Sequence, residues 1–258
     1  MEKRFFLRQG SLQIPCILTV PEQTQPQQVV LGVHGLGGSA RDTIQTGIAQ
    51  EMDIFCNATV RFDFPGHGES PMDGSAFTLE NCRASLLAAA CYAKEQFPET
   101  GDLCIFATGF GAYVTLLCLE QLLSLPGSIR LVIQTPSVCM DETLLSMIGR
   151  SRQTLWAMEK ITLPTPRPLE ITYSFYESLR QNSAMGIYSI PMLILQGEED
   201  SYIRMSDIQH FHRINEQSKL VILPGVSHRF AEEGAWDMVL DLTRDWFEFQ
   251  QVLLSDWD

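Results

Sequence analysis

The feature that most constrains the fold of this chain is the alternation of short apolar runs with longer amphipathic segments. Six apolar runs predict buried strands: Val29–Val33, Ala58–Phe64, Leu103–Ala107, Ile129–Thr135, Met192–Gln196 and Leu220–Leu223. The other segments predict helices: Ala40–Met52 with Ser39 as its N-cap, Thr78–Phe97, Ala112–Ser124, Ser206–Glu216 and Glu232–Leu253. This alternation predicts an α/β fold, a mostly parallel sheet with helices on both faces.

The N-terminal residues and the segment 141–189 depart from this alternation. Arg4–Arg8 and Leu12–Val20 predict an antiparallel pair without an intervening helix, which favours an open sheet of eight strands over a closed barrel. We interpret the proline- and aromatic-rich segment 141–189 as a helical cap, inserted into a single domain that spans 1–258. In open α/β sheets, ligands bind outside the carboxyl ends of the strands, so the cap would cover a substrate pocket. Its aromatic residues either line that pocket or pack the cap onto the core: Trp156, Tyr173, Phe175, Tyr176 and Tyr188.

Charge and cysteine content exclude several classes of protein. Acidic residues outnumber basic ones by 31 to 18, a net charge of −13, which we attribute to solubility. We expect no nucleic-acid partner and no anionic membrane surface, because both require clustered Lys and Arg. Seven scattered cysteines without a C-x-x-C pair favour a reducing, cytoplasmic location. The longest apolar run, Leu86–Ala93, is too short to cross a bilayer, and Met1–Arg8 lacks the pattern of a signal peptide.

Glycine-rich turns follow the first two buried strands. The N–H groups of His34-Gly-Leu-Gly-Gly38 can hold a developing oxyanion, whereas the glycine spacing does not fit the G-x-G-x-x-G pattern of a dinucleotide site. After the second strand, Asp63 and His67 flank the turn Pro65–Gly68. We expect these two residues to hold the turn by local hydrogen bonds rather than to act as a catalytic pair.

The turn after Leu103–Ala107 matches a nucleophile elbow except at its central residue. In the pattern G-x-S-x-G, small flanking residues allow a strained turn that presents a serine. Here the frame reads Ala107-Thr-Gly-Phe-Gly111, so Gly109 stands at the nucleophile position. We do not expect Thr108 to replace the serine, because its side chain points in another direction on so sharp a turn, and we expect Cys104 to be buried inside the strand.

An acid and a histidine follow the last two buried strands. Asp200 lies in the loop after Met192–Gln196, and His228 lies in the loop after Leu220–Leu223. Each alone is a weak signal, because turns and helix caps use both residue types. Their order after the elbow is the nucleophile–acid–histidine order of α/β-hydrolases, and together with the oxyanion turn they predict one site.

These segments resemble the α/β-hydrolase fold family, and in particular bacterial cinnamoyl/feruloyl esterases and similar small carboxylesterases. The resemblance covers nearly the whole chain and is carried by four segments: His34–Gly38, Val60–Phe64 with Gly66-His-Gly68, Gly197–Asp200 and Gly225–His228. It implies that Asp200 orients His228, that His228 is the general base, and that the N–H groups of Leu36 and Phe110 form the oxyanion hole. It also implies a small ester or related apolar ligand, with no metal and no organic cofactor.

Other polar residues have weaker claims to the site. Asp141 follows the strand where some hydrolases carry the acid, but Gly197–Asp200 matches the family better. His210 and His212 are two residues apart on a predicted helix and do not share a face, so we expect no metal site there. The remaining residues of the two loops are interpreted as solvated charges or as neighbours that line the site or pack nearby: Glu198, Glu199, Tyr202 and Arg229.

The glycine at position 109 leaves three functional hypotheses. Loss of the nucleophile of a serine triad costs about 10⁶-fold in turnover. The first hypothesis is therefore a carboxylic-ester hydrolase of small aryl, hydroxycinnamoyl or acyl esters that is impaired or inactive as written. The second is a non-catalytic protein that binds a small molecule in the retained pocket. The third is chemistry by the Asp200–His228 dyad alone, without a covalent intermediate.

Overall fold

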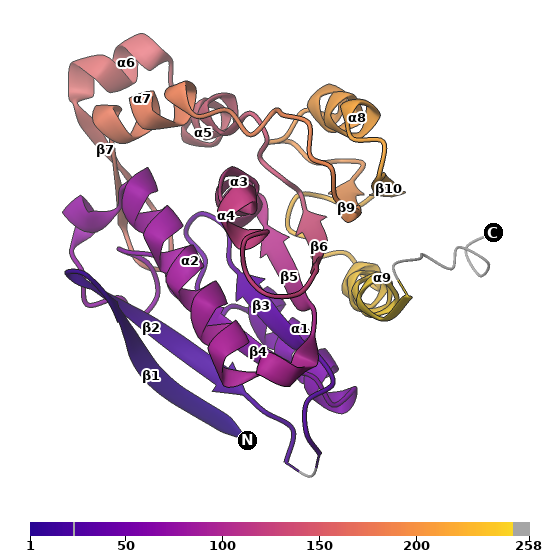
Figure 1. Ribbon diagram of the computed structural model, residues 1–258. Helices are drawn as coiled ribbons and strands as arrows, with labels where there is room; N and C mark the ends of the chain where they lie inside the picture. The colour runs from indigo at the N-terminus through magenta and orange to yellow at the C-terminus, as the bar shows by residue number, and fades with distance from the viewer. Residues whose placement is uncertain (23, 250–258) are drawn as a thin grey trace.

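An eight-stranded sheet forms the centre of the molecule (Figure 1). The computed structural model describes residues 1–22 and 24–249. The strands lie in the order β1-β2-β4-β3-β5-β6-β9-β10. Their bounds are β1 Glu2–Gln9, β2 Leu12–Thr19, β3 Val29–Val33, β4 Ala58–Phe62, β5 Leu103–Thr108, β6 Ile129–Gln134, β9 Met192–Gly197 and β10 Ser218–Leu223.

The direction of the strands confirms the predicted mostly parallel sheet. Strand β2 runs antiparallel to both β1 and β4, and every other neighbouring pair is parallel. The central strands β3, β4 and β5 are buried along their whole length, as expected for strands that are covered on both faces. The predicted N-terminal antiparallel pair is the hairpin β1–β2.

Helices cover both faces of the sheet, as predicted. The main helices outside the cap are α1 Thr43–Ile54, α2 Leu79–Gln96, α3 Gly109–Leu117, α4 Leu119–Leu122, α8 Met205–Ile214 and α9 Ala235–Phe249. Buried residues of α1 and α9 share one core cluster with Val30 and Phe106, and those of α2, α3 and α8 share another with Leu31 and Ile105. Consecutive strand residues thus point to opposite faces. Of the predicted helix Glu232–Leu253, residues 250–253 lie outside the described part.

Three predicted boundaries are wrong for identifiable reasons. Helix α1 is capped by Asp42, whose carboxylate accepts the N–H of Gln45, and not by Ser39. Strand β4 ends at Phe62, because the turn that follows is held by Asp63. Helix α3 begins at Gly109, three residues earlier than predicted, because the sharp turn after β5 forms the first turn of the helix.

The cap is only partly helical. It contains α5 Met140–Ile148, α6 Arg152–Met158, β7 Lys160–Leu163, β8 Leu169–Thr172 and α7 Tyr173–Gln181, with the three helices together at one end of the molecule (Figure 1, top). The antiparallel pair β7–β8 was not predicted from the sequence. The loop between β7 and β8 has a proline at every second position: Pro164, Pro166 and Pro168. Prolines interrupt regular structure, so the sequence pattern did not indicate the two short strands.

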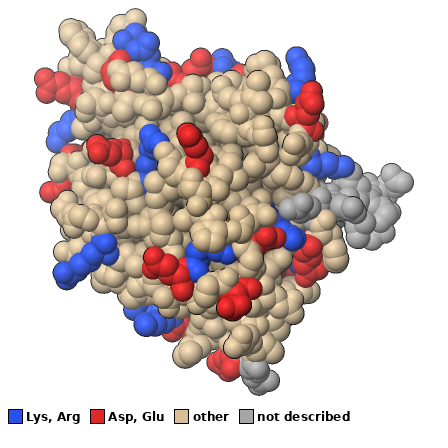
Figure 2. Space-filling view, in the orientation of Figure 1, with Lys and Arg blue, Asp and Glu red and all other residues tan. Residues whose placement is uncertain are grey.

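Acidic and basic side chains are interspersed on the surface. On the face shown in Figure 2, Lys and Arg lie among Asp and Glu, and the described part of this face carries no continuous basic area. Within residues 1–22 and 24–249, no helix is both long and apolar enough to cross a bilayer.

The close approach of α3 to the end of β3 depends on Gly111. A Cβ at this position would meet the carbonyl oxygen of His34 and would lie 2.7 Å from that of Val33. Backbone cannot yield as a flexible side chain does, so any side chain at 111 pushes the helix away from the sheet.

We expect Gly111→Ala to destabilise the protein by about 1–3 kcal/mol, because overpacking a rigid contact forces a backbone shift. The matched control is Gly186→Ala, where the nearest atom to the added Cβ is the Tyr188 hydroxyl at 3.4 Å, and we expect a change within about 1 kcal/mol. Urea unfolding of the two variants measures both values. Equal stabilities would contradict a critical contact at Gly111.

Candidate active site

The predicted site lies where the order of the strands reverses. Strand β4, which follows β3 in the chain, pairs with one edge of β3, and the next strand, β5, pairs with the other edge. Parallel strands with this arrangement leave a crevice at their carboxyl ends, between the loops that follow β3 and β5. These loops are the glycine-rich turn at His34–Gly38 and the elbow at Gly109.

Gly109 has the backbone conformation of a nucleophile elbow. Its φ of +48° lies in the left-handed region, directly between β5 and α3. Among the described residues outside the elbow and its helix, a Cβ built on Gly109 would have one neighbour within 4 Å, the hydroxyl oxygen of Ser137 at 4.0 Å. The position therefore has room for a side chain.

Neither Thr108 nor Cys104 presents a nucleophile at position 109. The Thr108 hydroxyl lies 3.4 Å from the position of a Cβ on Gly35, so it faces the turn after β3. Cys104 is buried in β5, where burial raises the pKa of its thiol to about 12. Neither is presented as a nucleophile.

The two predicted oxyanion donors lie on the two loops of the crevice. The turn after β3 is closed by a hydrogen bond from the Gly38 N–H to the Gly35 carbonyl at 3.0 Å. Within the described residues, the N–H of Leu36 has no acceptor. Phe110 is the second residue of α3, so its N–H has no partner within the helix and points along the positive end of the helix dipole. Their joint role as an oxyanion hole remains a prediction.

Asp200 and His228 form the predicted pair. Nδ1 of His228 lies 2.7 Å from Oδ2 of Asp200. The other carboxylate oxygen accepts the N–H groups of Tyr202 at 2.9 Å and Ile203 at 3.0 Å. Burial opposes ionisation of Asp200, but the hydrogen bond to His228 and the electrostatic interaction with it, together with these N–H groups, lower the pKa of Asp200 below its usual value.

The arrangement fixes the histidine in the form that a general base needs. A carboxylate can only accept, so a neutral imidazole in this place donates from Nδ1 to Asp200 and has its lone pair on Nε2. The side chain of His228 is 22% exposed, whereas that of Asp200 is 1% exposed. The ring of Tyr202 packs edge-on against the imidazole at 5.1 Å between centroids, and Arg229 is exposed.

A second group of polar residues supports the dyad. The side-chain amide of Gln196, buried at the end of β9, donates to Oδ2 of Asp200 at 3.1 Å. Glu198 was predicted to be a solvated charge, but its carboxylate accepts the N–H of Gly225 at 3.0 Å. This hydrogen bond joins the loop of Asp200 to the loop of His228. Asp141 instead lies in the first turn of α5.

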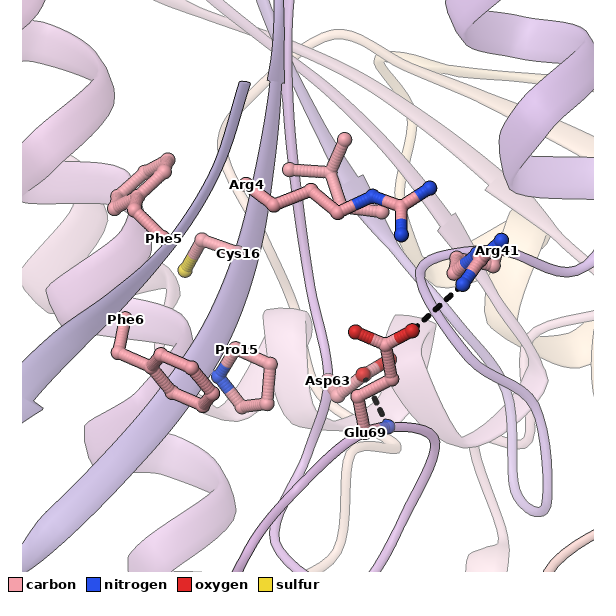
Figure 3. A pocket seen from close by; sticks show the side chains of 9 residues that line it. Arg4, Phe5, Phe6, Pro15, Cys16, Arg41, Asp63 and Glu69 are labelled. Atoms are coloured by element: carbon pink, nitrogen blue, oxygen red, sulfur yellow. Dashed lines mark hydrogen bonds and ion pairs between the residues drawn. The ribbon is translucent and has the colours of Figure 1, made fainter. Parts of the chain in front are cut away.

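Asp63 and His67 hold a turn, as predicted. The Asp63 carboxylate accepts the N–H groups of Ala40 at 2.7 Å and of Glu69 at 2.8 Å, and the side chain of Glu69 pairs with Arg41 (Figure 3). His67 bonds the carbonyl of Pro65 through Nδ1 at 3.0 Å. The small cavity of Figure 3, about 110 Å³, is bordered by this turn and by the hairpin β1–β2.

The cap packs directly on the elbow and on the oxyanion turn. The ring of Phe175 on α7 lies 4.4 Å from that of Phe77 and 6.1 Å from that of Phe110. Thr165 fills the place where a Cβ on Gly37 would stand. Arg167 donates to the carbonyls of several residues in the turn after β4, which ties the cap to the sheet: His67, Gly68, Ser70 and Met72.

Two hollows flank the site. One, of about 400 Å³, lies between the oxyanion turn and the cap and is lined in part by Gly37, His67 and Arg167. The other, of about 250 Å³, lies beside Asp200 and Tyr202 and is lined largely by polar side chains.

Within the described residues, no group of three His, Cys, Asp or Glu side chains is placed to hold a metal ion. His212 bonds Ser218 at 2.7 Å, and His210 is exposed.

Sequence reasoning missed two polar residues of the site. Gln196 gave a signal, because a glutamine stands out in the otherwise apolar run Met192–Gln196. Ser137 gave almost none, because a single serine after a strand is common in turns. Its place beside Gly109 emerges only when β5 and β6 pair.

Comparison with solved structures identifies the fold. The structure matches a protein from Agrobacterium vitis S4 that is described as a hydrolase, with a TM-score of 0.78 and 18% identity, over 95% of this chain and 97% of that one. It matches Est1E from Butyrivibrio proteoclasticus with ferulic acid bound, with a TM-score of 0.78 and 16% identity, over 95% and 98%. It matches α/β hydrolase domain-containing protein 10 from mouse, with a TM-score of 0.75 and 14% identity, over 96% and 100%.

The chain therefore has the α/β-hydrolase fold, with its elbow, acid and histidine loops in the order expected from the sequence. No protein-family model matches the sequence, and no curated protein sequence matches it.

The buried imidazoles beside the site predict a loss of stability in acid. Burial lowers the pKa of His34 to about 4, and burial together with His34 lowers that of His67 to about 3. In the unfolded chain both have a pKa of about 6.5. Between these values the unfolded chain binds protons that the folded protein does not, so the free energy of unfolding falls as the pH falls below about 6.5. The lowered pKa of Asp200 adds a further loss below about pH 4.

We expect His67→Asn to reduce this pH dependence near pH 5 by close to one proton, measured by urea unfolding at pH 7, 6 and 5. Asparagine can still donate to the Pro65 carbonyl but does not titrate in this range. The control is His210→Asn on the exposed surface of α8, which should keep the dependence of the unchanged protein. An unchanged slope in His67→Asn would contradict a neutral buried His67.

Proposed function

We propose that this protein is of the carboxylic-ester hydrolase type and that its usual nucleophile is replaced by Gly109. The observation that carries the proposal is the hydrogen bond of 2.7 Å between Asp200 and His228, on loops beside an elbow that keeps its left-handed backbone. The dyad and the elbow support a site of the acyl-transfer type in which position 109 has no side chain to attack the ester.

The proposed substrate is a small, uncharged ester, with aryl or hydroxycinnamoyl esters as the first class to test. Est1E, which has the same fold, binds ferulic acid. The hollow of about 400 Å³ beside the oxyanion turn falls in the size range of small-molecule sites. The net charge of −13 disfavours an acidic ligand, so an ester fits better than a free acid.

In this frame each residue has a separate task. The N–H groups of Leu36 and Phe110 would stabilise the oxyanion that develops on the substrate carbonyl. His228 would take the proton of the attacking hydroxyl on Nε2 and return it to the leaving alcohol, while the ionised Asp200 holds the imidazole in place. Gln196 and the N–H groups of Tyr202 and Ile203 keep Asp200 fixed and ionised.

A second function is a binding protein without turnover. The tight contact of Thr165 with the oxyanion turn and the hydrogen bonds of Arg167 favour a closed cap that retains a ligand. Action of the Asp200–His228 dyad on water or on a substrate proton is a third possibility, supported by the room for a side chain at Gly109. All seven cysteines are free, which supports the proposed reducing, cytoplasmic location.

We expect Gly109→Ser to create or strongly raise ester hydrolysis. The new hydroxyl has room beside Ser137, and the left-handed backbone costs about 1–3 kcal/mol of stability. The initial rate on methyl ferulate and p-nitrophenyl acetate should rise by at least about 10³-fold over the unchanged protein.

Gly109→Ala is the matched control, since it has the same backbone strain without the hydroxyl, and it should show no gain. Adding His228→Ala to Gly109→Ser should remove the gain, because the hydroxyl then has no base. A folded Gly109→Ser protein that stays inert on both esters would overturn the proposed ester chemistry.

A further inference from the structure

The hydroxyl of Ser137 is the group nearest to the missing nucleophile. It lies 4.0 Å from the place of a Cβ on Gly109, and in the part of the chain that the structure describes no other atom outside the elbow and its helix comes within that distance. Ser137 is 3% exposed, so an almost fully buried serine stands beside position 109.

The loop that carries Ser137 is built under strain. Thr135, the first residue after β6, has a φ of +44°, which is a genuine outlier for a β-branched residue. Its N–H donates to the Leu195 carbonyl on β9 at 2.8 Å, and the N–H of Ser137 donates to the Gly109 carbonyl at 3.3 Å. The strained turn is thus fastened on both sides, and it holds Ser137 against the elbow. Strain of this kind concentrates at functional sites.

Ser137 also lies on the path between the elbow and the dyad. Strand β6 is between β5, which leads to Gly109, and β9, which leads to Asp200. Neighbouring strands are about 4.8 Å apart, so the ends of β5 and β9 are separated by about 10 Å. His228 is held by Asp200, which lies in the loop after β9. Ser137, at the end of β6, is one strand closer to the dyad.

We propose that Ser137 supplies the nucleophilic hydroxyl that position 109 lacks. The inference rests on the proposed ester chemistry and goes beyond it by giving the unchanged protein its own nucleophile. Oγ of Ser137 attacks the ester carbonyl and forms an acyl–oxygen bond, and its proton passes to Nε2 of His228. The alcohol leaves with that proton. Water, activated by His228, then cleaves the acyl-serine and releases the acid. Gly109 leaves the space that the carbonyl carbon occupies.

The experiment is covalent labelling with a fluorophosphonate, which phosphonylates a serine that is activated by a base. The unchanged protein should take up one probe, and digestion with mass spectrometry should place the added mass on the peptide that holds Ser137. Ser137→Ala should lose the label, and its kcat/KM on p-nitrophenyl acetate should fall at least about 100-fold. Ser206→Ala, an exposed serine on α8, is the control and should keep both label and rate.

Two further variants separate this inference from the proposed function. Ser137→Cys keeps a nucleophile in place and should retain part of the esterase rate, which a purely structural role of the hydroxyl would not explain. If the unchanged protein carries no label, or carries it at another residue, while Gly109→Ser is labelled at position 109, the Ser137 proposal is overturned and the ester chemistry stands. If neither protein is labelled, both are overturned. Site mapping on the unchanged protein decides the matter even if Ser137→Ala fails to fold.

Discussion

The site depends first on the close contact between helix α3 and the end of strand β3. Gly111 permits this contact, because any Cβ there would collide with the backbone carbonyls of Val33 and His34. The contact brings the N–H of Phe110, at the start of α3, to the same crevice as the turn that carries Leu36. It also sets the elbow at Gly109, where the left-handed backbone connects the strand to the helix. This backbone arrangement is present although position 109 is a glycine.

The second constraint is the burial of an ionised acid. Asp200 is almost fully removed from water, which would raise its pKa if it stood alone. His228, Gln196 and two backbone N–H groups together supply its hydrogen bonds and keep it charged. A buried polar network of this kind stabilises the fold when its members are paired, because an unpaired polar group inside the protein is costly. The hydrogen bonds of Asp200 thus stay complete although position 109 is a glycine, and the proposed nucleophile Ser137 lies beside that glycine.

The cap closes the crevice by specific contacts rather than by general packing. Phe175 joins the aromatic rings beside the elbow, and Arg167 ties the cap to the turn after β4. The aromatic residues of the cap do not act as one group, since Phe175 and Tyr176 are buried whereas Trp156 is 65% exposed. Of the two roles considered for these residues, packing onto the core is thus shown for Phe175.

The sequence by itself determined the mostly parallel sheet, the cap insertion, the elbow with Gly109 and the pairing of Asp200 with His228. These follow from local patterns, because apolar runs, glycine spacing and residues at strand ends are read along the chain. Only the tertiary structure decided the β7–β8 pair, the Asp42 cap, the support of Asp200 by Gln196 and the place of Ser137. The hydroxyl of Ser137 lies beside Gly109 because β6 pairs with β5, and residues that are 28 positions apart in the sequence meet only through that pairing.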